Sequence, residues 1–183
     1  MTTRTPLPAG PPTRTATEKD PDRRFRRAAA RFPTGVTVVT ALAADGQPHG
    51  TTVNSFTTVS LDPRLILIAL GRRSRLHEVI LAGSDFAVSV LAGTQQEDAR
   101  RFADPARPPG AAGFAGRAWR PATHCGAPVL LDAVAYFDCA VHAAHPTGDH
   151  TLLVGRVQDF GVLGHTPALL FADSRLGPVK ELP

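Results

Sequence analysis

Most of the chain after residue 35 alternates between short apolar or β-branched stretches and polar turns, which is typical of a β-rich protein. Residues 36–42 are dense in valine and threonine, and the Asp45-Gly46 pair predicts a tight hairpin into a second strand near residues 50–55. Residues 65–70 are wholly apolar, as in a buried strand, and residues 84–91 alternate. Further strands are predicted at about 129–143, 151–160 and 168–172.

Three short helices are predicted beside these strands. Residues 22–32 carry phenylalanine and alanine at helical spacing, and Pro33 ends that helix. Ser74 is a candidate N-cap for a second helix, and Thr94 with Glu97 forms a capping box that opens a third helix, running to about residue 102. Many short strands with few helices predict a mainly β fold, a β-barrel with peripheral helices.

The chain divides into an arm and one domain. Residues 1–21 hold five prolines and almost no side chain to bury, so this segment is expected to be a disordered proline-rich arm. The remaining residues, 22–183, are enough for a single domain with a real core.

Charge and hydropathy argue against nucleic acid and membrane partners. The net charge is +4, but residues 1–31 carry eight basic and three acidic side chains, whereas the rest of the chain carries 12 basic and 13 acidic ones. A nucleic-acid module usually spreads its basic groups over a folded face. The longest strongly apolar run, residues 65–70, is far shorter than a membrane span needs, and no secretory signal is recognisable, so a cytoplasmic protein is expected.

Metal and covalent chemistry find little support. The two cysteines form no CxxC pair. Cys139 and His142 are of metal-ligating types, but in a strand they point to opposite faces, so no metal site is predicted. Nucleophile-elbow, Walker and dinucleotide-binding motifs are missing from the sequence. If the protein is an enzyme, its chemistry is expected to belong to a cofactor.

Residues 50–60 combine strand-forming residues with many small hydroxyl and amide side chains. Buried polar groups need hydrogen-bond partners, so a ligand rich in acceptors would explain this composition. A solvent-exposed edge strand explains it more simply, since polar alternation is normal in antiparallel sheets. Both interpretations stay open on composition alone.

Two turns could also contact a ligand. The basic segment at residues 71–75 follows the apolar strand and opens a helix, an arrangement that suits a phosphate group but also an ordinary basic surface turn. Residues 148–150, Gly-Asp-His, lie between two predicted strands and are adequately explained as a hairpin turn.

Four motifs in order resemble the short-chain flavin reductases, the reductase components of two-component flavin-dependent monooxygenases. They are FPTGVTVVT at residues 32–40, GTTVNSF at 50–56, VSLDP at 59–63, and GDH at 148–150 with GRV at 155–157. The resemblance runs from about Phe25 to Gly177.

The resemblance implies an FMN-binding split barrel that forms a homodimer. It also implies an enzyme that transfers hydride directly from NADH or NADPH to FMN or FAD and supplies reduced flavin to a separate monooxygenase. The residues at the positions of the family's site are Pro33, Thr34, Gly35, Thr52, Val53, Asn54, Ser55, Ser60, Ser74, Arg75, Gly148, Asp149 and His150. The resemblance implies that Ser74 and Arg75 lie near the flavin phosphate and that His150 positions the nicotinamide.

Rival functions from other classes remain. The same barrel could be a flavin-binding carrier or sensor without turnover, or a barrel that binds heme or pyridoxal phosphate. One departure from the family also stands out: Leu176 occupies a position that is commonly aromatic in the resembling proteins. This departure leaves open whether the C-terminal segment stacks on a ligand.

Overall fold

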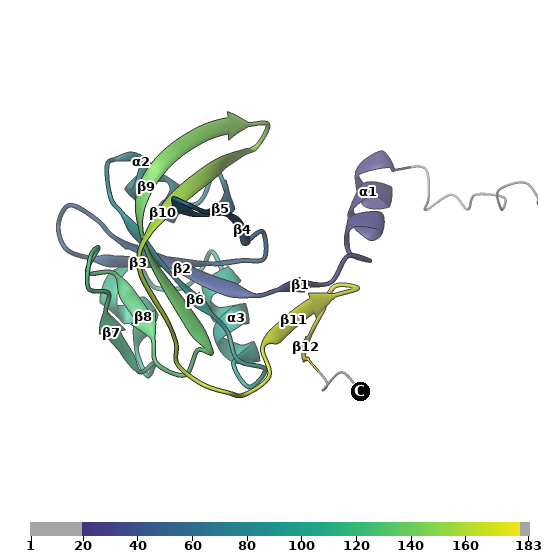
Figure 1. Cartoon of the computed structure of the whole chain (residues 1–183). Coiled ribbons are helices and arrows are strands. Elements are labelled where there is room, and N and C mark those ends of the chain that lie inside the picture. The colour runs from purple at the N-terminus through teal and green to yellow at the C-terminus, as the bar shows by residue number, and fades with distance from the viewer. Residues whose placement is uncertain (1–19, 180–183) are drawn as a thin grey trace, which may run out of the picture.

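The computed structural model describes residues 20–179 and is built around one seven-stranded antiparallel sheet. The sheet curls so that its strands wrap around a core, and the long β9–β10 hairpin extends beyond it (Figure 1). In spatial order the strands are β3 (Pro48–Val53), β2 (Thr37–Leu42), β6 (Phe86–Val90), β9 (Ala135–Thr147), β10 (His150–Val162), β5 (Arg64–Gly71) and β4 (Thr57–Leu61). The predicted mainly β barrel is confirmed.

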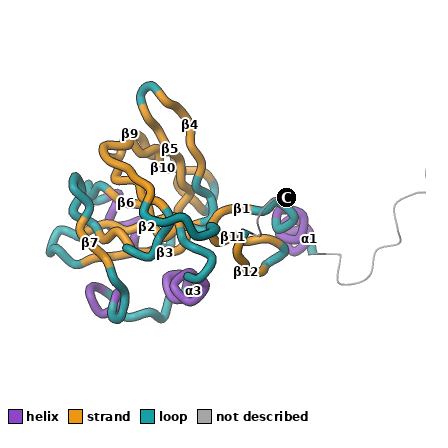
Figure 2. The backbone as a smooth tube through the Cα atoms, turned by 60° about the horizontal axis from the view of Figure 1, so that its bottom comes forward, coloured by secondary structure: helices purple, strands orange, loops and turns teal. Residues whose placement is uncertain are grey.

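Smaller elements flank this sheet. A three-stranded sheet consists of β1 (Thr34–Gly35), β11 (Leu169–Ala172) and β12 (Arg175–Pro178), and a two-stranded one consists of β7 (Trp119–Pro121) and β8 (Pro128–Leu130). The helices are α1 (Pro21–Ala29), α2 (Arg75–Leu81), α3 (Gln96–Ala103) and the 3₁₀ helix η2 (Gly110–Phe114). In two views α1 lies beside the β11–β12 hairpin, apart from the main sheet (Figures 1 and 2).

A side chain, rather than a ladder of backbone hydrogen bonds, connects the end of β3 to β5. Within the described residues, no strand pairing joins β3 to β5. Instead the Ser55 hydroxyl, just after β3, donates to the Ala69 carbonyl at 3.1 Å and accepts from the Ala69 amide at 2.9 Å. One serine therefore satisfies both backbone groups of a β5 residue and holds the two strand ends together.

The interior is filled mainly by alternating residues of the main sheet. On β5, Ile66, Ile68 and Leu70 are buried, whereas the residues between them are only partly covered. Residues 65–70, expected to form a buried strand, therefore bury only one face of it. Gly155 on β10 lets Phe86 approach closely, since a Cβ there would stand 2.6 Å from the Phe86 ring.

The predicted capping of α3 is wrong. Helix α3 begins at Gln96, with Gln95 rather than Thr94 at the N-cap. The Gln95 side chain accepts a hydrogen bond from the Ala92 amide at 2.9 Å and donates to Asp98 at 3.1 Å. A buried glutamine that links the helix to the preceding turn replaces the local Thr–Glu exchange.

Two further expectations change in detail. Residues 129–143, predicted as one strand, are divided between β8 and β9 by a turn. The expected arm, residues 1–21, lies outside the described residues apart from Asp20 and Pro21, which begin α1: the Asp20 carboxylate accepts from the Asp22 amide at 3.0 Å, and Pro21 fits the first helical turn. The described helices include none that is long and apolar enough to span a membrane.

We predict that Ser55→Ala lowers the free energy of unfolding by about 1–3 kcal/mol, because it leaves two half-buried backbone groups of Ala69 without partners. Urea denaturation of the variant measures this loss. The control Thr58→Ser, at an exposed position of β4, should change the stability by no more than about 0.5 kcal/mol. Equal stability of Ser55→Ala and the wild type would show that this side chain does not hold the barrel closed.

Candidate functional site

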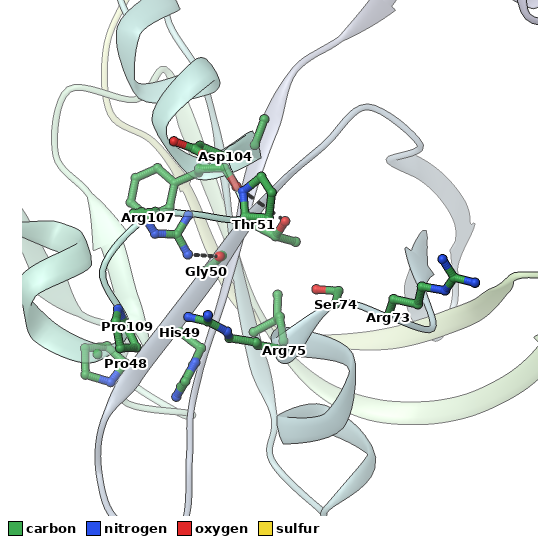
Figure 3. A pocket seen from close by; sticks show the side chains of 15 residues that line it. Pro48, His49, Gly50, Thr51, Arg73, Ser74, Arg75, Asp104, Arg107 and Pro109 are labelled. Carbon is green, nitrogen blue, oxygen red and sulfur yellow. Dashed lines mark hydrogen bonds between the residues drawn. The ribbon is translucent and has the colours of Figure 1, made fainter.

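Two neighbouring cavities meet at Ser74, where β5 turns into α2. The first, which we call the strand cavity, has a volume of about 190 Å³ and is lined by residues 51–55, 69–71, Ser74 and His150. The second, the basic cavity, has a volume of about 390 Å³ and is lined by residues 48–51, 73–76 and 102–105, together with Arg107, Pro109 and Gly110 (Figure 3). Thr51 and Ser74 line both, so the two cavities adjoin each other.

The hydroxyl groups of the polar strand bond mainly to the protein itself. The Thr51 hydroxyl donates to the Phe102 carbonyl at 3.4 Å, and that of Thr52 donates to the Ala99 carbonyl at 2.7 Å. Together with Ser55, these groups attach β3 to α3 and to β5. The interpretation that a ligand must satisfy these groups is therefore wrong for their protons, which backbone carbonyls already accept.

The other two residues of this segment differ in exposure. Val53 is buried in the core, so only its backbone faces the strand cavity. Asn54 is exposed, and its amide donates to the Thr34 hydroxyl at 3.3 Å. This bond connects the Pro33-Thr34-Gly35 segment, at the start of β1, to the end of the polar strand.

Ser74 occupies the N-cap position of α2, but its side chain makes no cap hydrogen bond. The expected N-cap position is therefore confirmed, but the hydroxyl does not bond to the helix and is available to a ligand in the cavities. The turn that presents it is held by the Ser74 amide, which donates to the Gly71 carbonyl at 2.9 Å. Arg75 follows, and its side chain extends across the basic cavity (Figure 3).

The β9–β10 turn forms the wall opposite the polar strand. Gly148 has a φ of +59°, which favours glycine at this tight turn. The Arg72 amide donates to the Asp149 carbonyl at 3.0 Å and so joins this turn to the basic turn. His150 Nδ1 lies 2.7 Å from the Asp149 carboxylate, and this hydrogen bond holds the pKa of Asp149 below its usual value.

Arg107 is a site residue that the sequence analysis missed. Its guanidinium donates to the Gly50 carbonyl at 2.6 Å and lies 4.7 Å from the centre of the Phe102 ring. Burial, and then the nearby charges of Arg101 and Arg75, hold the pKa of Arg107 below its usual value. Arg107 belongs to a loop rich in proline, glycine and alanine, so no local spacing connects it with Ser74.

Other expected site residues lie apart from these cavities. Ser60 is on β4 opposite Leu65 of β5, whereas the strand cavity adjoins the other end of β5. Pro33, Thr34 and Gly35 line neither of the two cavities, although Thr34 contacts Asn54. Within one chain, the structure therefore brings together the polar strand, the basic turn and the His150 turn, but not these four residues.

Leu176, at the position expected to be aromatic, pairs with Phe171 across β11 and β12. Both residues line a largely apolar cavity of about 240 Å³, which also includes Val36, Thr52 and Asn54. The leucine keeps this surface apolar but offers no ring for stacking.

Residues 29–180 match the model of the flavin reductase like domain. The chain belongs to the flavin reductase-like family. This match covers more than half of the chain, including every segment that lines the two cavities. The resemblance noted in the sequence is confirmed.

Individual flavin reductases are similar over most of the chain. An NADH-dependent FAD reductase of Streptomyces globisporus is 46% identical over 133 residues, which is 73% of this chain and 72% of that protein. The structure of the Streptomyces globisporus NADH:FAD oxidoreductase in complex with NAD and FAD fragments has a TM-score of 0.80 at 39% identity, over 88% of this chain and 95% of the other. The styrene monooxygenase flavin reductase of Pseudomonas putida S12 has a TM-score of 0.75 at 36% identity, over 87% and 99%.

For this flavin reductase-like protein we predict that Ser74→Ala leaves the free energy of unfolding within about 0.5 kcal/mol of the wild type, because the side chain makes no cap hydrogen bond. Ser84→Ala is the matched comparison: the Ser84 hydroxyl donates to the Leu42 carbonyl at 2.7 Å, and its removal should cost about 1 kcal/mol. Urea denaturation compares the two. A loss at Ser74 as large as that at Ser84 would contradict an unengaged Ser74 hydroxyl.

Proposed function

We propose that this protein is an NADH-dependent flavin reductase that transfers hydride from the reduced nicotinamide to FAD or FMN. The observation that supports this most strongly is the junction at Ser74, whose unengaged hydroxyl lines both cavities, with Arg75 in the basic cavity and His150 in the strand cavity. These groups fit a flavin phosphate, because hydroxyl donors and guanidinium groups are the partners that phosphate oxygens prefer. The names of the similar proteins favour NADH as donor and FAD as acceptor.

The flavin supplies the hydride-accepting chemistry, and the chain's own residues bind and orient. Ser74 and Arg75 would hold the phosphate at the mouth of the strand cavity. The backbone of Val53 and the side chains of Thr52, Asn54 and Ser55 would line the ring, with the hydroxyl protons of Thr52 and Ser55 already donated to backbone carbonyls. No protein nucleophile is needed, since hydride transfer requires positioning and electrostatic stabilisation rather than a covalent step.

His150 is proposed to position the nicotinamide. A neutral ring that donates from Nδ1 to Asp149 keeps Nε2 as an acceptor. Nε2 lies near Gly71, 3.8 Å from where a Cβ on that glycine would stand, and so borders the strand cavity. An acceptor there suits the NH₂ group of the nicotinamide carboxamide. Gly148 and Asp149 shape and hold the turn that carries it.

The remaining expected residues are proposed to act at a subunit boundary. The protein is expected to be a homodimer, and α1 supports this because none of its residues is buried and Phe25 is 75% exposed. Ser60 and the Pro33-Thr34-Gly35 segment would then contact the flavin from outside the cavities of a single chain. The reduced flavin is proposed to pass to a separate monooxygenase, and a cytoplasmic location stays a prediction from the sequence.

The direct test of the proposed function is aerobic oxidation of NADH and NADPH by the purified protein, with no flavin, with FMN and with FAD. The proposal predicts oxidation of NADH that depends on added flavin. Protein that binds flavin but oxidises neither nicotinamide would contradict the proposal and favour the carrier or sensor instead. A heme or pyridoxal phosphate spectrum of the purified protein would also contradict it.

We predict that His150→Ala raises the KM for NADH by up to about 10-fold with a smaller change in kcat, since one neutral hydrogen bond is lost. The Kd for flavin should stay unchanged. His150→Gln, which keeps an acceptor, should restore part of the NADH affinity. If His150→Ala has the NADH affinity and turnover of the wild type, the positioning role is wrong.

A further inference from the structure

The basic cavity extends well beyond the position proposed for the first flavin phosphate. With a volume of about 390 Å³ it is larger than the strand cavity, at about 190 Å³, and lies within the range of roughly 300–1,000 Å³ typical of ligand pockets. A flavin mononucleotide whose phosphate lies at Ser74 would leave most of this space empty. Binding of FMN alone therefore does not account for the cavity.

Positive charge converges in this space. The Arg75 side chain extends across the cavity toward Arg107 and His49, whereas Arg73 points away (Figure 3). Asp104 contributes the lining's one carboxylate, and its Oδ1 already accepts from the Ala106 amide at 2.8 Å. The inner wall therefore presents two guanidinium groups that Asp104 does not neutralise by a direct ion pair within the described residues.

Arg107 is held in place before any ligand arrives. Its hydrogen bond to the Gly50 carbonyl and its position over the Phe102 ring fix the guanidinium at the cavity wall. Its Nε is buried without a hydrogen-bond partner within the described residues. The neighbouring charges of Arg75 and Arg101 add to burial in holding its pKa down, so a bound anion would relieve an electrostatic cost that the fold now carries.

The outer walls suit a planar, weakly polar group. Pro48 and Pro109 line the side of the cavity opposite Ser74, and half-buried His49 lies between them and Arg75 (Figure 3). The exposed Pro109 ring offers apolar surface against which a nucleobase can pack. The cavity thus combines a cationic inner wall with an apolar outer wall, which is the chemistry of a nucleoside monophosphate.

We propose that the basic cavity is an adenylate subsite that binds the second phosphate of FAD at Arg107 and thereby makes this protein select FAD over FMN. The inference rests on the proposed flavin reductase function and names the preferred acceptor for the same site. Thr51 and Ser74 line both cavities, so one continuous ligand can occupy them together. The nicotinamide cofactor also contains an adenylate, and the test separates the two sources.

The experiment measures Kd values for FAD, FMN and riboflavin by quenching of flavin fluorescence, with no nicotinamide present. The variant Arg107→Met keeps the side-chain stem over Phe102 but removes the charge. It should raise the Kd for FAD by roughly 10-fold or more, as expected for a lost charged hydrogen bond, while the Kd values for FMN and riboflavin stay nearly unchanged. Arg75→Ala should weaken both FAD and FMN but spare riboflavin.

Controls separate a site effect from damage to the fold. Arg156→Ala removes an exposed arginine of β10 that lines neither cavity, and should leave all three Kd values unchanged. If Arg107→Met fails to fold, His49→Glu places a carboxylate in the same cavity and should weaken FAD selectively. Thermal unfolding of each variant shows whether it is folded.

Two results would overturn the adenylate subsite. The first is an unchanged ratio of the FAD and FMN Kd values in folded Arg107→Met or His49→Glu. The second is an increased KM for NADH in either variant, measured with FMN as acceptor, without any change in the Kd for FAD. This result would assign the cavity to the nicotinamide cofactor. Failure of the proposed function looks different: wild-type protein would bind FAD and FMN but oxidise no NADH.

Discussion

The contact between Ser55 and Ala69 is the constraint on which the candidate site depends. The edges of the seven-stranded sheet are β3 and β4, and in the described residues no strand pairing joins β3 to β5, so the Ser55 side chain supplies the two hydrogen bonds between the end of β3 and β5. This contact places the end of the polar strand opposite Ser74 and the His150 turn. Had β3 paired with β5 along its length, backbone hydrogen bonds would occupy the space that is now the strand cavity.

The same constraint divides the polar groups into two sets. The hydroxyls of Thr51, Thr52 and Ser55 donate hydrogen bonds to backbone carbonyls and so attach β3 to α3 and β5. A ligand then finds these three hydroxyl protons already donated, whereas Ser74 and Arg75 still offer donors. Such an arrangement suits a flavin, whose phosphate needs donors and whose ring carries N–H as well as acceptor groups.

Features that depend on local spacing were predictable from the sequence: the β2–β3 hairpin, the short helices and the His150 turn. Features that depend on distant contacts were not. Gln95 displaces Thr94 as N-cap because it reaches Ala92 and Asp98, and Arg107 enters the site because its loop folds back on Gly50. Ser60 shows the opposite case. It is close to the polar strand in the sequence, but β4 carries it to the other end of β5, away from the strand cavity. The resemblance to the family predicted the function, and the structure shows which of the expected site residues lie together within one chain.

The proposed reaction requires that flavin held by this protein accepts hydride from NADH. Anaerobic mixing of NADH with the protein–FAD complex, followed through the visible absorption of oxidised flavin, measures that step without oxygen or a partner enzyme. We expect rapid loss of the visible band with equimolar NADH, and a far slower loss when the protein is omitted. A protein-bound flavin that keeps its oxidised spectrum in excess NADH and NADPH would show that the protein is not a flavin reductase.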